Sequence, residues 1–265
     1  CRFCSTPRLH GRTLRTVPPE RIAALGAEFP ASGPVALNIE DDNLLLKPDY
    51  LCRLLETLRQ GNPGFSWTGE NGLDYSLLSP ELLIRLRRLG LSRLNISLGT
   101  PEENAGRENR FFDWGAYLGV LRTAQAAGLP VISYFICGLE GDRPENAPRL
   151  LARLAGLPTA AGLSLYYPGG EQNPGEESPR LWAGSSAYPW TGSLSTGELL
   201  TAFRLARFSR LLKQPLPSPE DRTLRDQILG EKRLWTRIGK GKEKALIPVP
   251  ALDRKMIALF FENLP

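Results

Sequence analysis

Short runs rich in β-branched and aromatic residues alternate with helical patterns along the first two thirds of the chain. Each run has Gly or Pro close by, which is typical of a strand bounded by turns. Strands that alternate with helices build parallel βαβ units, so the sequence predicts an α/β fold. The predicted strands are Val35–Glu40, Phe65–Glu70, Arg93–Leu98, Val131–Cys137 and Leu163–Tyr167.

Apolar spacing and start and stop signals mark the helices between these strands. In one helix Ser79 is the candidate N-cap and Pro80 takes the first helical position. The spacing there predicts burial of Leu82, Leu86 and Leu89. Helices are predicted at 18–29, along the leucine stripe 51–58, from 80 to Gly90, from 114 to Gly128, and after Pro144 to about 154.

The first predicted helix precedes the first predicted strand. In a βα alternation this helix should follow another strand, which would lie upstream of Cys1. The chain also begins without Met, so we expect it to start inside a longer polypeptide. Six strands in total predict an open, partial (β/α)6 barrel of the TIM type that lacks its first strand here. Because such barrels bind ligands at the C-terminal ends of their strands, the loop with Cys1 and Cys4 would lie at the ligand face.

The composition changes after Tyr167. Residues 168–190 are rich in Gly, Pro and Ser and predict a loop or lid. Ser195 and Glu198 form a capping box that opens a helix to about Leu212. Further helices are predicted at 219–231 and 252–264, with a basic loop at 237–244. We therefore expect a core barrel at 1–170 and a mostly helical C-terminal extension at 171–265 that contacts substrate or forms a lid.

Composition narrows the classes of function. The 265 residues carry a net charge of +5, and the basic residues are spread over many segments, so nucleic-acid binding is not indicated. No apolar run approaches the ~18 residues of a membrane span. Cysteines at 1, 4, 52 and 137 do not resemble a disulfide framework, which favours a reducing, cytoplasmic setting. Cys52 and Cys137 are expected to be buried packing residues.

Cys1 and Cys4 form a CxxC pair with Phe3 before the second thiol. Such a pair is found in redox motifs, in zinc sites, in iron–sulfur sites, or by chance. A redox pair usually opens a helix, whereas Ser-Thr-Pro follows here. A zinc ribbon needs a second pair, which this sequence does not contain. The pair by itself leaves the iron–sulfur reading and a zinc or redox module open.

Five segments occur in an order that resembles the radical S-adenosylmethionine (radical SAM) superfamily over residues 1–170. The resemblance is to members that carry a cobalamin-binding domain ahead of the radical domain. Cys1, Phe3 and Cys4 match the second half of the family's CxxxCxxC motif, whose first Cys would lie four residues before Cys1. The segments are CRFCSTPRLHGR at the start, IEDDN at 39–43, LNISLGT at 94–100, YFICGLEGD at 134–142 and LSLYYPGG at 163–170.

The resemblance implies an enzyme. Three thiolates, two of them Cys1 and Cys4, would hold a 4Fe–4S cluster with one open iron, and Phe3 would border the cofactor. S-adenosylmethionine would bind that iron and be cleaved by one electron to a 5′-deoxyadenosyl radical. A reductant such as flavodoxin or ferredoxin would supply the electron, and an upstream domain would bind cobalamin. Methyl transfer, methylthiolation and carbon-skeleton chemistry are all compatible, and the substrate is not identified.

Two strands supply polar cofactor contacts by this resemblance. Glu40, Asp41 and Asp42 stand where the family receives the methionine amine, and carboxylates attract an ammonium group. The alternative is that Asp41 and Asp42 only form a turn, which these residues favour. Asn95 and Ser97 alternate along the predicted strand Arg93–Leu98, and so would share a face that points into the barrel.

Residues 135–142 resemble the family's Ile-x-Gly-Leu-Pro-Gly-Glu. Ile136 would border the adenine, and Gly138 would allow close approach of the backbone. Glu140 stands where Pro is usual, and Asp142 stands where Glu is usual. Tyr167, after the last strand, would line the adenine or the substrate.

A different class of function fits the same residues. Two thiolates cannot by themselves hold a site-differentiated 4Fe–4S cluster, so this chain alone would be a non-catalytic barrel scaffold or remnant. A CxxC zinc or redox module is a third reading, and it predicts no affinity for S-adenosylmethionine. A Cys encoded four residues before Cys1 would favour the enzyme.

Overall fold

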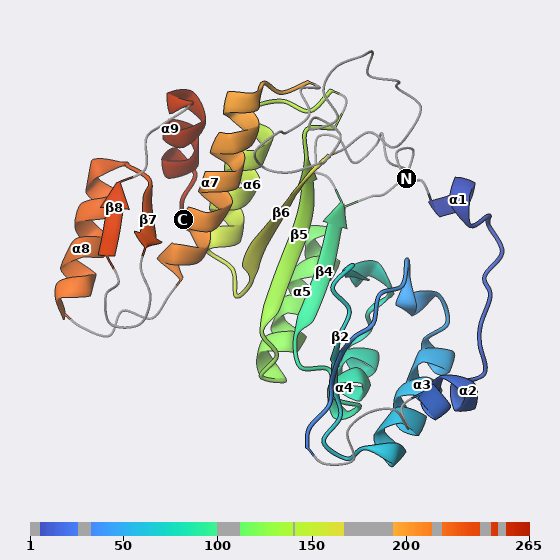
Figure 1. Cartoon of the computed structure of the whole chain (residues 1–265). Coiled ribbons are helices and arrows are strands. Elements are labelled where there is room, and N and C mark those ends of the chain that lie inside the picture. Colours follow the sequence, from blue (N-terminus) through green and yellow to red (C-terminus); the bar gives the residue numbers. More distant parts are fainter. Residues whose placement is uncertain are drawn as a thin grey trace. The chain divides into compact units, whose positions relative to one another are not determined.

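The chain forms two compact units, each described here by itself (Figure 1). The N-terminal unit spans Cys4–Leu98 and Phe111–Tyr134, and the C-terminal unit comprises Cys1–Phe3, Gly99–Arg110 and Phe135–Pro265. The computed structural model describes residues 6–25, 33–99, 112–139, 141–166, 193–213, 219–238, 245–248 and 253–265.

Strands and helices alternate in the N-terminal unit, and its strands pair in parallel. β1 pairs with β2, and β3 pairs with β4. This confirms the predicted α/β fold with parallel strands, while the six-stranded barrel remains a prediction. The elements are α1 (Thr6–Leu9), α2 (Pro19–Leu25), β1 (Ala36–Asn38), the 3-10 helix η2 (Leu44–Leu46), α3 (Pro48–Gly61), β2 (Ser66–Thr68), β3 (Leu73–Asp74), the 3-10 helix η3 (Tyr75–Leu77), α4 (Pro80–Arg88), β4 (Leu94–Gly99), α5 (Trp114–Ala126) and the first half of β5 (Val131–Cys137).

β2 and β3 are two parts of one extended region. Trp67 in β2 forms a parallel bridge with Leu91, just before β4, and Leu73 in β3 pairs with Ile96 within β4. Both parts therefore follow the same neighbouring segment, and pairing is interrupted between them. The region thus continues past the predicted strand end at Glu70, because β3 resumes the pairing.

Helix α4 begins and ends at the predicted signals. The Ser79 hydroxyl accepts a hydrogen bond from the Leu82 backbone N–H at 3.1 Å. Gly90 follows the helix with φ +98°, and a Cβ there would lie 2.7 Å from the Phe65 carbonyl oxygen. Only glycine fits this position, since an L-residue would be strained and would clash with backbone.

The helices bury their apolar faces against one another. In α3 the predicted stripe is confirmed, because Leu51, Leu54 and Leu55 are buried together with Cys52. In α4 the fully buried residues are Leu83 and Leu86, whereas Leu82 and Leu89 are half-buried. The predicted burial of these last two was wrong in part, because α4 packs between α3 and α5 and its contact face is centred on Leu83 and Leu86.

In the C-terminal unit, α7 packs against α6, β6 and α9 (Figure 1). The predicted capping box is present, since Glu198 N–H donates to the Ser195 hydroxyl and Ser195 N–H donates to the Glu198 carboxylate. The second half of β5 neighbours β6. The elements are α6 (Asn146–Ala155), β6 (Ala160–Leu165), α7 (Thr196–Leu212), α8 (Pro219–Glu231), β7 (Trp235–Ile238), β8 (Ala245–Pro248) and α9 (Arg254–Glu262).

The C-terminal region contains an antiparallel strand pair that the sequence analysis missed. β7 and β8 pair from Trp235 with Pro248 to Ile238 with Ala245. The basic loop predicted at 237–244 therefore begins inside a strand. The Gly- and Lys-rich residues between the strands carry the loop signal, and each four-residue strand is too short to show a periodicity of its own.

No helix in the described part of the chain has the length and apolarity to cross a bilayer.

The Lys213 ammonium joins the C-terminal ends of α6 and α7. Its Nζ donates to the Leu157 carbonyl oxygen at 2.7 Å, and also to the carbonyl oxygens of Leu154 and Thr159. These carbonyls lie at the end of α6 and in the turn before β6, where backbone acceptors lack helical partners. Burial lowers the pKa of Lys213 to about 8.

This shift predicts a pH dependence of stability. Between about pH 8 and 10.5 the unfolded chain keeps the Lys213 proton that the folded chain has released, so the free energy of unfolding should rise with pH. The slope is at most about 1.4 kcal/mol per pH unit, and smaller because the side chain is partly exposed. Urea unfolding across this range measures it. Lys213→Met should remove this part of the slope and Lys255→Met, on the exposed side of α9, should not; identical slopes in all three proteins would contradict the assignment.

Candidate functional site

Polar side chains are joined by hydrogen bonds across neighbouring strands of the N-terminal unit. Asn38, at the end of β1, donates from Nδ2 to Glu40 Oε1 at 2.8 Å. Its Oδ1 accepts from the Glu70 backbone N–H at 2.9 Å. These bonds fix the ends of β1 and β2 to each other through one amide side chain.

The same chain of contacts continues to β4. Arg93 donates from Nη2 to Glu70 Oε1 at 2.6 Å and from Nε to Asn95 Oδ1 at 3.1 Å. Asn95 is 1% exposed and donates from Nδ2 to the Gly69 carbonyl oxygen at 3.2 Å. We call Asn38, Glu40, Glu70, Arg93 and Asn95 the polar network.

Strand alternation places the polar network on one face. Leu37 and Ile39 line a pocket together with leucines of α3. Because successive side chains of a strand point to opposite faces, Asn38 and Glu40 face away from α3. The polar network therefore lies on the face of β1 that is turned away from α3.

The polar network has an acidic excess. Glu40 and Glu70 carry two negative charges, and Arg93 carries one positive charge. The cation is held by Glu70, whereas Glu40 is exposed and forms no ion pair among the described residues. A carboxylate in this state can attract an ammonium group of a ligand.

The other two acids of the IEDDN segment have different partners. Asp41 Oδ1 accepts from the Asn43 backbone N–H at 3.1 Å, which is the hydrogen bond of a turn, the alternative role predicted for this segment. Asp42 Oδ1 accepts from the Thr6 hydroxyl at 3.2 Å. Thr6 is two residues after Cys4, so the segment that follows the CxxC pair reaches the acidic loop. Only Glu40 of the three acids joins the polar network.

A second group of contacts surrounds the loop after β5 in the C-terminal unit. Asp142, 5% exposed, accepts from the Gly138 backbone N–H at 2.9 Å, the Arg143 backbone N–H at 3.0 Å and Asn146 Nδ2 at 2.9 Å. Gly138 has φ +91°, and a Cβ there would lie 3.0 Å from Leu199 Cδ2. The carboxylate of Asp142 therefore holds this loop in a backbone conformation that favours glycine.

The structure describes only some of the remaining predicted site residues. Ser97 and Ile136 are half-buried within β4 and β5. Cys1, Phe3, Cys4 and Tyr167 lie outside the described residues. The sequence analysis missed Asn38 and Arg93, although each stands two residues before a chosen residue on the same strand face, at the spacing that alternation requires.

Cluster ligation by the other two cysteines does not fit the structure. Cys52 and Cys137 are fully buried, and burial raises the pKa of both thiols, that of Cys137 well above its ordinary value. Iron binds the thiolate, which these environments disfavour. The described residues also contain no group of three or more His, Cys, Asp or Glu side chains that could hold a metal ion.

Asn95 is expected to stabilise the fold in addition to its place in the polar network. Asn95→Leu removes the Nδ2 donor to the Gly69 carbonyl oxygen, which keeps the Gly72 backbone N–H as a donor at 3.1 Å, and it releases Arg93 Nε. The loss of these two side-chain hydrogen bonds should lower the free energy of unfolding by about 1–3 kcal/mol. Urea unfolding of the purified chain measures it. Ser97→Ala, two residues on in the same strand, is the matched control and should change stability by less than about 0.5 kcal/mol. Equal effects of both substitutions would contradict a structural role for the network.

The family model of the radical SAM superfamily matches residues 1–154, a range that includes Cys1, Cys4, the polar network and Asp142. A search of the curated proteins gives no match.

Among solved structures, the chain is similar to the radical S-adenosylmethionine methyltransferase TsrM from Kitasatospora setae, determined with cobalamin and a [4Fe–4S] cluster bound. The identity is 17% and the TM-score 0.43, over 55% of this chain and 29% of that one. The chain thus spans less than a third of that protein. The family match covers more than half of the present chain, and the protein therefore belongs to the radical SAM superfamily.

Proposed function

We propose that this chain is the core of a radical SAM enzyme that cleaves S-adenosylmethionine reductively. The observation that carries the proposal is the family match over residues 1–154, which includes both cysteines of the CxxC pair. Membership in the family implies a [4Fe–4S] cluster and S-adenosylmethionine. Cys1 and Cys4 would be two ligands of that cluster, and a Cys four residues upstream of Cys1 would be the third.

The chain's own residues would bind and orient S-adenosylmethionine. Glu40 would receive the amine, with Asp41 and Asp42 adding negative charge nearby. Asn95 and Ser97 would offer polar contacts from β4. A bound cluster supplies the electron that cleaves the cofactor, and the protein supplies position and electrostatics.

Apolar and backbone groups would hold the other end of the cofactor. Ile136 and Gly138 would border the adenine, and Tyr167 would line the adenine or the substrate. Phe3 would shield the cluster. The acceptor bonds of Asp142 support this role for the loop, because they fix the Gly138 backbone before any ligand arrives.

Several finer proposals follow from the sequence resemblance. Residues 1–170 would form the core of an open six-stranded barrel completed by an upstream strand, and residues 171–265 would contact the substrate or cover it. An upstream domain would bind cobalamin, and a flavodoxin or ferredoxin would supply the electron. Reduced thiols and a cluster fit a cytoplasmic setting.

Anaerobic reconstitution tests the function. The chain, and a version extended upstream through the encoded residues of the cluster motif, are incubated with iron and sulfide, and EPR spectra of the reduced proteins are recorded with and without S-adenosylmethionine. We expect only the extended form to hold a cluster whose signal changes with S-adenosylmethionine, because the third thiolate is needed. If neither form binds a cluster, the enzyme proposal fails and a non-catalytic scaffold takes its place. Zinc binding in its stead would favour a CxxC module.

A further inference from the structure

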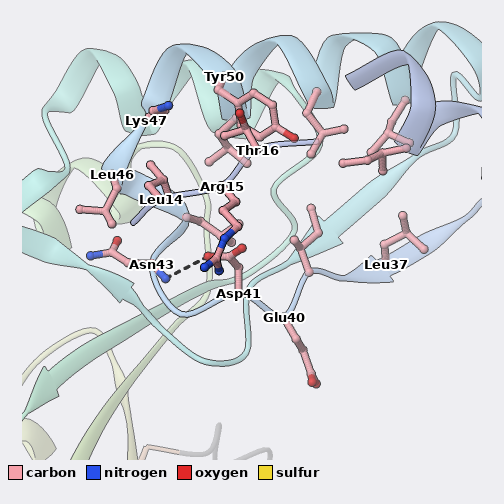
Figure 2. A pocket seen from close by; sticks show the side chains of 16 residues that line it. Leu14, Arg15, Thr16, Leu37, Glu40, Asp41, Asn43, Leu46, Lys47 and Tyr50 are labelled. Carbon is pink, nitrogen blue, oxygen red and sulfur yellow. Dashed lines mark hydrogen bonds between the residues drawn. The ribbon is translucent and has the colours of Figure 1, made fainter. Parts of the chain in front are cut away.

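A cavity of about 320 Å³ lies in the N-terminal unit between β1, α3 and the segment before α2 (Figure 2). This volume is at the lower end of the range for pockets that hold small molecules. Its wall is aliphatic and comes from three elements. The residues that form the wall are Ile22, Leu37, Ile39, Leu51, Leu54 and Leu58.

The cavity is separate from the polar network. Leu37 of β1 and Ile39, directly after β1, line the cavity, whereas Asn38 and Glu40 alternate with them and belong to the polar network. Glu40 touches the rim, but Figure 2 shows its carboxylate pointing away from the other labelled side chains. An occupant of this cavity would therefore leave Asn38 and the Glu40 carboxylate free, although it would lie beside Asp41, which the proposed cofactor position also uses.

Two cations and two anions line the cavity, so its formal charges balance. Arg15 and Lys47 are cationic, Glu40 and Asp41 are anionic, and the Glu40 carboxylate points away from the other labelled side chains (Figure 2). Asp41 already accepts the Asn43 N–H, and one nitrogen of Arg15 donates to the His10 carbonyl oxygen at 3.1 Å. Lys47 has neither a hydrogen bond nor an ion pair with any side chain that the structure describes, so it is the cation available to a ligand.

Exposed leucines flank the cavity. Leu14 is 45% exposed and Leu46 is 57% exposed, and both are among its lining residues. Tyr50 also lines the cavity, and its hydroxyl donates to the Val17 carbonyl oxygen at 2.5 Å. A ligand whose apolar part reaches past the rim would cover these leucines, which water otherwise contacts.

We propose that this cavity binds a medium-chain aliphatic carboxylate. The aliphatic chain would lie against the leucine wall, and the carboxylate would lie at Lys47 with a second donor from Arg15. A water molecule takes about 30 Å³ of liquid, so the cavity has room for about ten atoms of that size, which corresponds to a chain near decanoate in length.

Titration calorimetry with decanoate tests the proposal on the whole 265-residue chain, without cluster or S-adenosylmethionine. Its outcome is therefore independent of the proposed enzymatic function. We expect saturable binding of one decanoate per chain. Octanoate should bind roughly tenfold more weakly, because two buried methylenes are removed. Decanol should bind at least about threefold more weakly than decanoate, because it lacks the charge that Lys47 attracts.

Amino-acid substitutions test whether decanoate binds in this cavity. Lys47→Met should weaken decanoate by about threefold to tenfold and leave decanol unchanged, whereas the control Lys255→Met, an exposed lysine of α9, should change neither. Leu46→Asp alters an exposed side chain and should weaken the binding of both ligands.

Absence of saturable binding by the folded chain overturns the proposal. So does equal binding of decanoate and decanol, or decanoate affinity that survives Lys47→Met. Binding only to anionic lipid vesicles, with none to free decanoate, also overturns it.

Discussion

Replacing Cys4 by Ala in the upstream-extended chain is expected to abolish the [4Fe–4S] cluster and all reductive cleavage of S-adenosylmethionine. Three thiolates leave one iron open for the cofactor, and two cannot hold that arrangement. The effect should be complete and not graded, because no other thiol of the chain is suited to take over. Iron and sulfide content, the EPR signal and the release of 5′-deoxyadenosine measure it.

The other two cysteines provide matched controls. Cys52 is buried on α3 and Cys137 is buried in β5, and burial raises the pKa of both thiols. Cys52→Ala and Cys137→Ala should therefore keep the full cluster content. These substitutions should only lower the free energy of unfolding, by about 1 kcal/mol, because each removes a small buried volume. Loss of the cluster in Cys137→Ala together with its survival in Cys4→Ala would contradict the assignment of Cys4.

Local signals in the sequence were sufficient to predict where several helices begin or end. Helix α4 is bounded by Ser79 and Gly90, and both signals act through the backbone within one turn of the helix. The capping box at Ser195 is local in the same way. The buried face of α4 is different, because it depends on where α3 and α5 lie. That is why Leu83 replaces Leu82 as a core residue.

The polar network shows the same limit at the candidate site. Asn38 and Glu70 are 32 residues apart, and Arg93 is 23 residues from Glu70. Alternation can place each residue on a strand face, but not beside a given partner on another strand, because strand register is set by the fold. The resemblance to the family therefore indicated Glu40 and Asn95, whereas the hydrogen bonds that connect them needed the structure.

Asp142 illustrates how a departure from a family pattern can be read physically. The family usually has Glu at this position, and the sequence alone gave no role for the shorter acid. In the structure its two oxygens accept from Gly138, Arg143 and Asn146, and its proximity is one of the causes that raise the pKa of the Cys137 thiol, after burial. One carboxylate thus satisfies donors from both sides of the loop that follows β5.

Asp142→Leu is consequently expected to destabilise the folded chain by about 3 kcal/mol or more. The Gly138 N–H and the Asn146 amide would lose a charged acceptor in a buried place, and each such loss costs about 1–3 kcal/mol. Urea unfolding measures the change. Glu145→Gln is the control, because Glu145 is an exposed acid three residues away whose side chain forms no cap bond with α6, and it should change stability by less than about 0.5 kcal/mol.

Asp142→Asn separates the folding role from the cofactor role. It keeps the size of the side chain but turns one acceptor into a donor, so it should cost less stability than Leu while still freeing either the Gly138 N–H or the Asn146 amide. If Gly138 borders the adenine, the affinity of the folded Asn variant for S-adenosylmethionine should fall by about tenfold or more, since a misplaced backbone loses its contacts. Full stability loss with unchanged affinity would mean that Asp142 supports only the fold, and that the adenine lies elsewhere. Unchanged stability would contradict the role of its carboxylate altogether, because at least one buried donor would have lost its acceptor without cost.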